Sequence, residues 1–74
     1  QLEPRELDEC INTLETQILA ASTQVASSMI HTVGVMLGNF REFSERFPED
    51  EGNNLRKRRL LYVMIKAYAH YDKP

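Results

Sequence analysis

The chain has 74 residues, of which 42% are hydrophobic and 27% charged, so its composition fits one ordinary globular domain and excludes a disordered or low-complexity segment. Nine basic and eleven acidic residues give a formal net charge of −2, which argues against a domain that binds nucleic acid through bulk positive charge. A single cysteine, Cys10, excludes an internal disulfide and with it the class of small secreted disulfide scaffolds.

The small size of the chain predicts that a partner completes it. A domain of this length buries only about 60% of the surface that its unfolded chain exposes, and its core alone supplies no more than roughly 3–5 kcal/mol. Since the sequence offers neither a disulfide nor a metal-ligand spacing, we expect the remaining stability to come from another chain. The first residue is Gln1 and not Met, so we also expect these residues to be a segment of a longer protein.

Apolar residues recur at steps of three and four along the first two thirds of the chain, which predicts an amphipathic helix. Pro4 suits the first turn of that helix, and the next proline is Pro48. The sequence therefore predicts one helix over about residues 4–46, near 60 Å long at 1.5 Å per residue. Its apolar stripe consists of Leu7, Ile11, Leu14, Ile18, Ala21, Val25, Met29, Val33, Met36, Phe40, Phe43 and Phe47.

The spacing of this stripe distinguishes a bundle from a long coiled coil. The 4-3 spacing of a left-handed coiled coil holds from Leu7 to Val25, relaxes over the eleven residues from Val25 to Met36, and then returns. We therefore expect a bundle of fairly straight helices.

Residues 47–54 form the strongest break in the helical pattern. Pro48 disfavours helical geometry at Phe47, and Gly52 is a turn former. Asn54 can cap a second helix over about residues 55–72, antiparallel to the first. The predicted fold is all-α: a single domain over residues 1–74, built as a hairpin of one long and one shorter helix that another chain completes into a bundle. The apolar face of the second helix consists of Leu60, Leu61, Met64, Ile65, Tyr68 and Tyr71.

Residues 16–40 contain no Asp, Glu, Lys or Arg, and three interpretations compete for this uncharged segment. A transmembrane span is disfavoured because its many hydroxyl and amide side chains are costly in lipid. A helix buried in a bundle is favoured, since Leu19, Ala26, Ile30 and Leu37 form a second apolar face that one short arm does not cover. Gly34 and Gly38, spaced as GxxxG, would allow close approach of helices.

The third interpretation concerns residues 18–33, which read Ile18-x-x-Ala21-Ser22-x-x-Val25-Ala26-x-x-Met29-x-x-Thr32-Val33. This segment resembles the vinculin-binding helices of talin-type rods, which have aliphatic, small and paired apolar positions at the same offsets. It departs from them at Ser22 and Thr32, where those helices have alanine and an aliphatic residue. The resemblance implies a helix that docks into the helical bundle of another protein.

The basic run Arg56-Lys57-Arg58-Arg59 is the alternative site. Such a run can dock an acidic partner, bind nucleic acid or direct nuclear import. Four consecutive helical residues point to all sides, however, and the acidic residues 49–51 lie close enough to neutralise them. We therefore expect a solvated, locally compensated turn, with an acidic-partner site at these four residues as the second interpretation.

Catalytic and metal-binding patterns are absent from the sequence. Cys10, His31 and His70 lie far apart, and the sequence contains no CxxC, HxxxH or HExxH. We therefore expect neither an enzyme nor a bound cofactor or metal. No signal-peptide pattern is visible, which together with the lone cysteine predicts a cytoplasmic location, with the nucleus as the alternative.

These observations predict a non-enzymatic module for protein–protein interaction, through self-association or through docking as a subunit, in the manner of an adaptor or chaperone. The alternatives are a basic-patch module acting through residues 56–59 and a membrane-associated helix. The predicted protein interface consists of Ile18, Val25, Met29, Ile30, Val33, Gly34, Met36, Leu37, Gly38 and Phe40.

Overall fold

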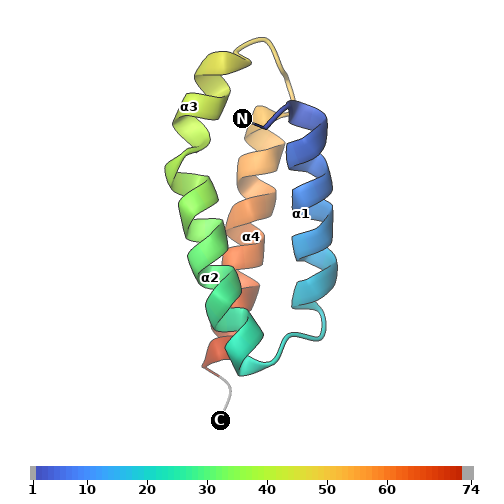
Figure 1. Cartoon of the computed structure of the whole chain (residues 1–74), viewed down its shortest axis with the longest axis vertical. Coiled ribbons are helices and arrows are strands. Elements are labelled where there is room, and N and C mark those ends of the chain that lie inside the picture. Colours follow the sequence, from blue (N-terminus) through green and yellow to red (C-terminus); the bar gives the residue numbers. More distant parts are fainter. Residues whose placement is uncertain (1, 73–74) are drawn as a thin grey trace.

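The computed structural model describes residues 2–72 and contains four helices (Figure 1). These are α1 (Pro4–Ile18), α2 (Thr23–Gly38), α3 (Phe40–Arg46) and α4 (Asn53–Tyr71). Helix α3 continues upward from α2 after the single residue Asn39, and α4 runs back down between α1 and α2 (Figure 1). The result is an elongated antiparallel bundle with extents of 43 × 19 × 19 Å. The prediction of an all-α chain is confirmed.

The structure differs from the expected hairpin because residues 4–46 do not form one helix. Helix α1 ends at Ile18, and the chain reverses direction before α2 begins at Thr23. Ser22 caps the new start: its backbone is extended (φ −71°, ψ 168°), and its hydroxyl accepts a hydrogen bond from the Val25 N–H at 3.2 Å. Residues 18–33, which resemble vinculin-binding helices, are therefore divided between two helices and a turn.

The reversal at residues 19–22 places the apolar stripe inside the molecule. Each of the four helices contributes side chains to one core, so the chain covers most of the stripe with its own helices. Most of the stripe is therefore covered by the chain itself, while the expectation that another chain completes the bundle stays a prediction. The buried core consists of Leu7, Ile11, Leu14, Ile18, Met29, Val33, Phe40, Phe43, Leu60, Val63 and Ala67.

The second turn lies close to its predicted position at residues 47–54. Helix α4 begins at Asn53 with Gly52 as its N-cap, and not at residue 55 after a capping Asn54. Side chains tie this turn together: the Gly52 N–H donates to the Asp50 carboxylate at 2.8 Å, and the Asn53 amide donates to the Phe47 carbonyl at 2.9 Å. A Cβ atom on Gly52 would lie 3.1 Å from that Asp50 carboxylate, so the tight turn favours glycine.

Candidate protein-interaction groove

An open groove runs along the bundle between α1 on one side and α2 and α3 on the other. Three adjoining hollows of about 320, 510 and 410 Å³ follow it from the α3 end to the end near residues 19–22. Leu2 and Met36 are shared by the first two hollows, and Leu14 and Thr32 by the second and third, so the depression is continuous. We call it the α1–α2 groove.

The groove exists because α4 separates the two helices on either side of it. Leu7 and Leu14 of α1 and Met29 and Met36 of α2 reach over α4 from opposite sides, and all four line the groove. In a four-helix bundle a fourth helix would cover side chains in this arrangement. The groove is therefore a place where core side chains and the partly buried Met36 lie at the surface of the molecule.

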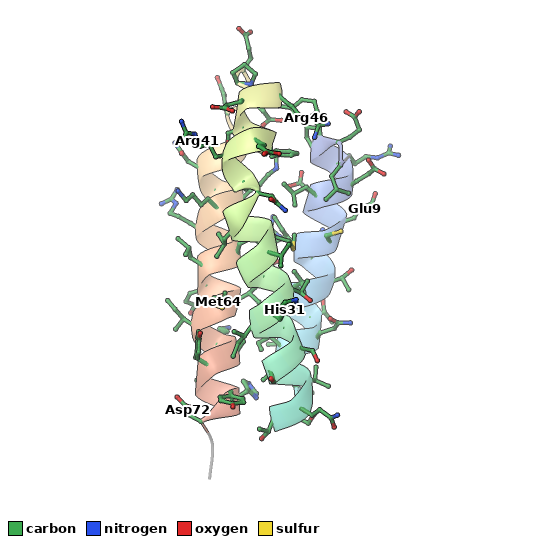
Figure 2. The ribbon with its side chains drawn as sticks, turned by 60° about the vertical axis from the view of Figure 1, so that its left-hand side comes forward. Glu9, His31, Arg41, Arg46, Met64 and Asp72 are labelled. Carbon is green, nitrogen blue, oxygen red and sulfur yellow. The ribbon has the colours of Figure 1, made fainter. Side chains whose placement is uncertain are left out.

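The α2 wall of the groove is uncharged. Helix α2 contains no Asp, Glu, Lys or Arg, although a surface helix ordinarily carries charge on its solvent side. Figure 2 shows the exposed His31 on α2, with Met64 of α4 at a similar height and Glu9 of α1 higher up on the other side. The residues that α2 contributes to the groove are Gln24, Val25, Ser28, Met29, Thr32, Val35 and Met36.

Charge in the groove is confined to the end formed by α3 and the start of α1. Glu6, Glu9 and Glu42 lie there, together with Arg46. Arg46 is already engaged, because its Nη2 donates to the Leu2 carbonyl at 3.1 Å and its guanidinium lies 4.8 Å from the centre of the Phe47 ring. This end of the groove therefore has an acidic character, while the opposite end is neutral.

The ten residues of the predicted interface are distributed over three environments. Ile18, Met29, Val33 and Phe40 are buried in the core of the chain itself, and Ile30, Met36 and Leu37 pack against that core. Val25, Gly34 and Gly38 are exposed. Four of the ten line the α1–α2 groove: Val25, Met29, Met36 and Phe40.

The two glycines of α2 are not required by contacts within the chain. A Cβ atom on Gly34 would lie 3.7 Å from the Met64 Cε, which is an ordinary contact distance. A Cβ atom on Gly38 would meet no atom of the described residues within 4 Å. The role of Gly34 and Gly38 in the approach of another helix stays a prediction.

Sequence reasoning missed the contribution of α1 to the groove. The predicted stripe includes Leu14, but Cys10 and Thr13, which also line the groove, are not among the predicted interface residues. No local sequence pattern identifies these two residues. In one continuous helix over residues 4–46, residues 10 and 13 could not lie opposite residues 32 and 36 across a groove.

Arg56, the first residue of the basic run, is turned inward and only 8% exposed. Its Nε and Nη2 donate to the two carboxylate oxygens of Asp8 at 2.7 and 3.1 Å, and its Nη1 lies 2.9 Å from the Asp50 carboxylate. The hydrogen bond from Arg56 holds the pKa of the Asp8 carboxyl below its ordinary value, against the opposing effect of burial. The same guanidinium, together with the Gly52 N–H, lowers the pKa of Asp50.

Arg59 makes a second connection between α4 and α1. Its Nε and Nη2 donate to the Glu15 carboxylate at 2.9 and 2.6 Å, and Nη2 also donates to the Asn12 amide oxygen at 2.6 Å. Hydrogen bonding from Arg59 lowers the pKa of the Glu15 carboxyl. Lys57 and Arg58 are exposed, so two of the four basic residues remain for an external partner.

The described residues contain no group of three side chains suited to hold a metal ion. Cys10 lies on α1 and His31 on α2, and both are exposed. His70 lies near the end of α4, with its Nδ1 3.0 Å from the Ala21 carbonyl, and this contact ties the loop at residues 19–22 to α4. Cys10 and the two histidines are thus not brought together in the structure.

Within residues 2–72 no helix is both long enough and apolar enough to cross a membrane. Comparisons of the chain with models of known protein families, with curated proteins and with solved structures give no match. Function is therefore argued from the surface of the molecule itself.

Proposed function

We propose that this chain is a non-enzymatic protein-association module whose α1–α2 groove takes up an amphipathic helix of another protein chain. The observation that carries the proposal is the continuous apolar groove between two helices, in the position of a fourth bundle helix. Such docking makes the chain a subunit or adaptor, and the exposed lone cysteine fits a cytoplasmic location.

The groove favours a partner helix on energetic grounds. Leu2, Val25 and Val35 line it and are 39–51% exposed. Complete burial of an aliphatic side chain contributes about 1.5–3 kcal/mol, so covering the exposed halves of these three contributes about 3 kcal/mol. The hydroxyl and amide groups of the α2 wall cost far less to remove from water than charged groups would.

The charges around the groove indicate the orientation of the partner. Glu6 accepts a hydrogen bond from the Glu3 N–H, and Glu9 lies 3.8 Å from the Arg5 Nε. Together with Glu42, these carboxylates still make this end acidic, which favours basic residues at the end of the partner helix that lies beside α3. The end between Leu14 and Val25 has no charged residue but has four amide or hydroxyl side chains, so it favours an uncharged segment of the partner. The proposed partner is therefore a helix with one apolar face and a basic end.

Cys10 makes the proposal directly testable because it is the only cysteine, is exposed and lines the groove. A thiol-reactive photo-crosslinker attached to Cys10 of the 74-residue chain should link to the partner in extracts of its own cells. The matched control carries the same probe on Thr16, an exposed α1 residue outside the groove, in a Cys10→Ser/Thr16→Cys variant. We expect a discrete cross-linked product from Cys10 and none from position 16.

A pair of substitutions on α2 identifies the groove as the binding surface. Thr32→Arg places a large charged side chain in the groove, whereas Ser27→Arg places it on another exposed side of α2. Thr32→Arg should abolish the cross-link from Cys10, and Ser27→Arg should retain it. Equal cross-linking in both variants, or equal products from positions 10 and 16, would refute the proposal.

A further inference from the structure

We infer that the outer side of α4 associates with a second copy of this chain, with the two α4 helices antiparallel and a two-fold axis passing beside Ile65. This surface is separate from the α1–α2 groove. Its apolar part consists of Leu61, Ile65 and Tyr68, which are 43%, 65% and 50% exposed. We call these three residues the α4 stripe.

The α4 stripe lies opposite the side of α4 that faces the core. Leu60, Val63 and Ala67 are fully buried on the inner side, while the spacing of four and three residues places Leu61, Ile65 and Tyr68 together on the outer side. Met64 borders the stripe where α4 meets α2 and is half-buried (Figure 2). The outer side of α4 thus has an apolar centre where a solvated helix would carry charged residues.

Charged residues lie at both ends of the stripe, and they are symmetric about Ile65. Arg58 precedes Ile65 by seven residues and Asp72 follows it by seven, and both are exposed. Seven residues make close to two helical turns, so all three positions lie on the same side of the helix. This side of α4 therefore has a positive charge at Arg58, the apolar α4 stripe in the middle and a negative charge at the C-cap residue Asp72.

This symmetry selects a second copy in antiparallel orientation. A two-fold axis beside Ile65 places Arg58 of each copy opposite Asp72 of the other, so two opposite-charge pairs form at once. It also brings Leu61 of one copy beside Tyr68 of the other, which buries both. A parallel arrangement would instead place Arg58 beside Arg58 and Asp72 beside Asp72, and like charges repel.

The adjoining part of α2 permits this association. A two-fold axis makes each part of an interface meet a symmetric copy, so a surface of one charge sign would repel itself. Helix α2 borders the stripe through Gly34, next to Met64, and has no charged residue along its length. The α2 flank of the proposed dimer therefore adds no repulsion between like charges.

The contact between two helices is small, so the dimer is expected to be weak and to depend on concentration. Sedimentation equilibrium of the chain at concentrations up to about 1 mM covers the range in which such contacts form. Ile65→Asp places two carboxylates side by side at the axis and should weaken dimerisation by about 100-fold or more. Thr16→Asp, at an exposed position of α1 outside the α1–α2 groove, serves as the matched control and should leave the dimer intact.

Charge reversal tests both the partner and the orientation. Arg58→Glu and Asp72→Arg should each weaken self-association about tenfold, because both pairs become repulsive. A mixture of the two variants should restore association, because the glutamate introduced at position 58 of one copy then faces the arginine introduced at position 72 of the other. The unaltered Arg58 and Asp72 pair at the second site of this mixed dimer. All of these positions are exposed, so circular dichroism should show unchanged helix content.

A chain that remains monomeric throughout this range would overturn the inference, as would a mixture that associates no better than either variant alone. A dimer that survives Ile65→Asp would show that another surface is used and would equally overturn it. Cross-linking from Cys10 to a partner in the groove does not depend on these residues, so the proposed function is tested separately.

Discussion

Helix α1 has two long sides, and they are completed in different ways. On the side of α4, Asp8 and Glu15 are held by Arg56 and Arg59, and the apolar residues beneath these ion pairs are buried. On the side of α2, the one side-chain hydrogen bond that crosses the groove within residues 2–72 joins Arg46 to the Leu2 carbonyl. The chain therefore closes the α1–α4 contact with its own side chains and leaves the α1–α2 side open, which is the side that we propose another molecule covers.

The largest effect is expected in the core beneath the closed α1–α4 contact. Leu60→Ala removes a fully buried side chain and should lower the free energy of unfolding by about 2–5 kcal/mol. Val25→Ala in the open groove should cost less than about 1 kcal/mol, because Val25 is 43% exposed. Urea unfolding monitored by circular dichroism measures both; similar losses for the two variants would mean that the two sides of α1 are not packed differently.

The second-largest loss of stability is expected when the ion pairs between α1 and α4 are removed. Arg56→Met leaves Asp8 and Asp50 without their guanidinium partner and should lower the free energy of unfolding by about 1–3 kcal/mol. This loss is smaller than the loss expected for a fully buried ion pair, because the Asp8 side chain is 40% exposed. Lys57→Met, at the adjacent exposed position, should change stability by less than about 0.5 kcal/mol. Thermal unfolding of Arg56→Met and Lys57→Met, measured under the same conditions, tests this prediction. Equal melting temperatures of the two variants would contradict a stabilising role of the Arg56 ion pairs.

A smaller effect is expected at the reversal that creates the groove. Ser22→Ala removes the hydroxyl that accepts from the Val25 N–H and should cost about 1 kcal/mol. Ser27→Ala, on an exposed turn inside α2, should be neutral or slightly stabilising, since alanine has the higher helix propensity. If Ser22→Ala proved as stable as Ser27→Ala in chemical unfolding, α2 would not depend on this cap.

The smallest effect is a dependence of the Arg56 contribution on pH. Because Arg56 lowers the folded-state pKa of Asp8 and Asp50, its ion pairs stabilise the fold above the unfolded-state pKa of about 4 and lose this contribution as the pH falls through the lowered values. The stability difference between the unsubstituted chain and Arg56→Met should therefore be largest near neutral pH and narrow below about pH 4. Urea unfolding at a series of pH values tests this, and a constant difference would rule out these carboxylates as the cause.

The sequence predicts the turn at residues 47–52 well but gives no indication of the turn at residues 19–22. Pro48 and Gly52 mark the turn before α4, because one restricts the preceding backbone and the other suits a tight connection. Ser22 carries no comparable mark, since serine occurs both inside helices and at their starts. The apolar steps from Ile18 to Ala21 and Val25 also continue through the reversal, so periodicity alone predicts one helix where there are two.

The environment of α4 side chains shows a second limit of sequence reasoning. Leu60 and Leu61 are neighbours of the same residue type, yet one is fully buried and the other 43% exposed. Arg56 likewise looks like Lys57 in the basic run but reaches Asp8, which lies 48 positions away. These differences depend on which helices pack around α4, and a local pattern contains no such information.

Helical class, the turn near Pro48 and the absence of charge over residues 16–40 follow from composition and spacing, because they are properties of neighbouring residues. The groove, the inward Arg56 and the exposed α4 stripe depend on the reversal at Ser22, which places α1 and α2 on opposite sides of α4. One hydroxyl cap contributes only about 1 kcal/mol, so the choice between one long helix and two rests on the core that the folded-back helices form together.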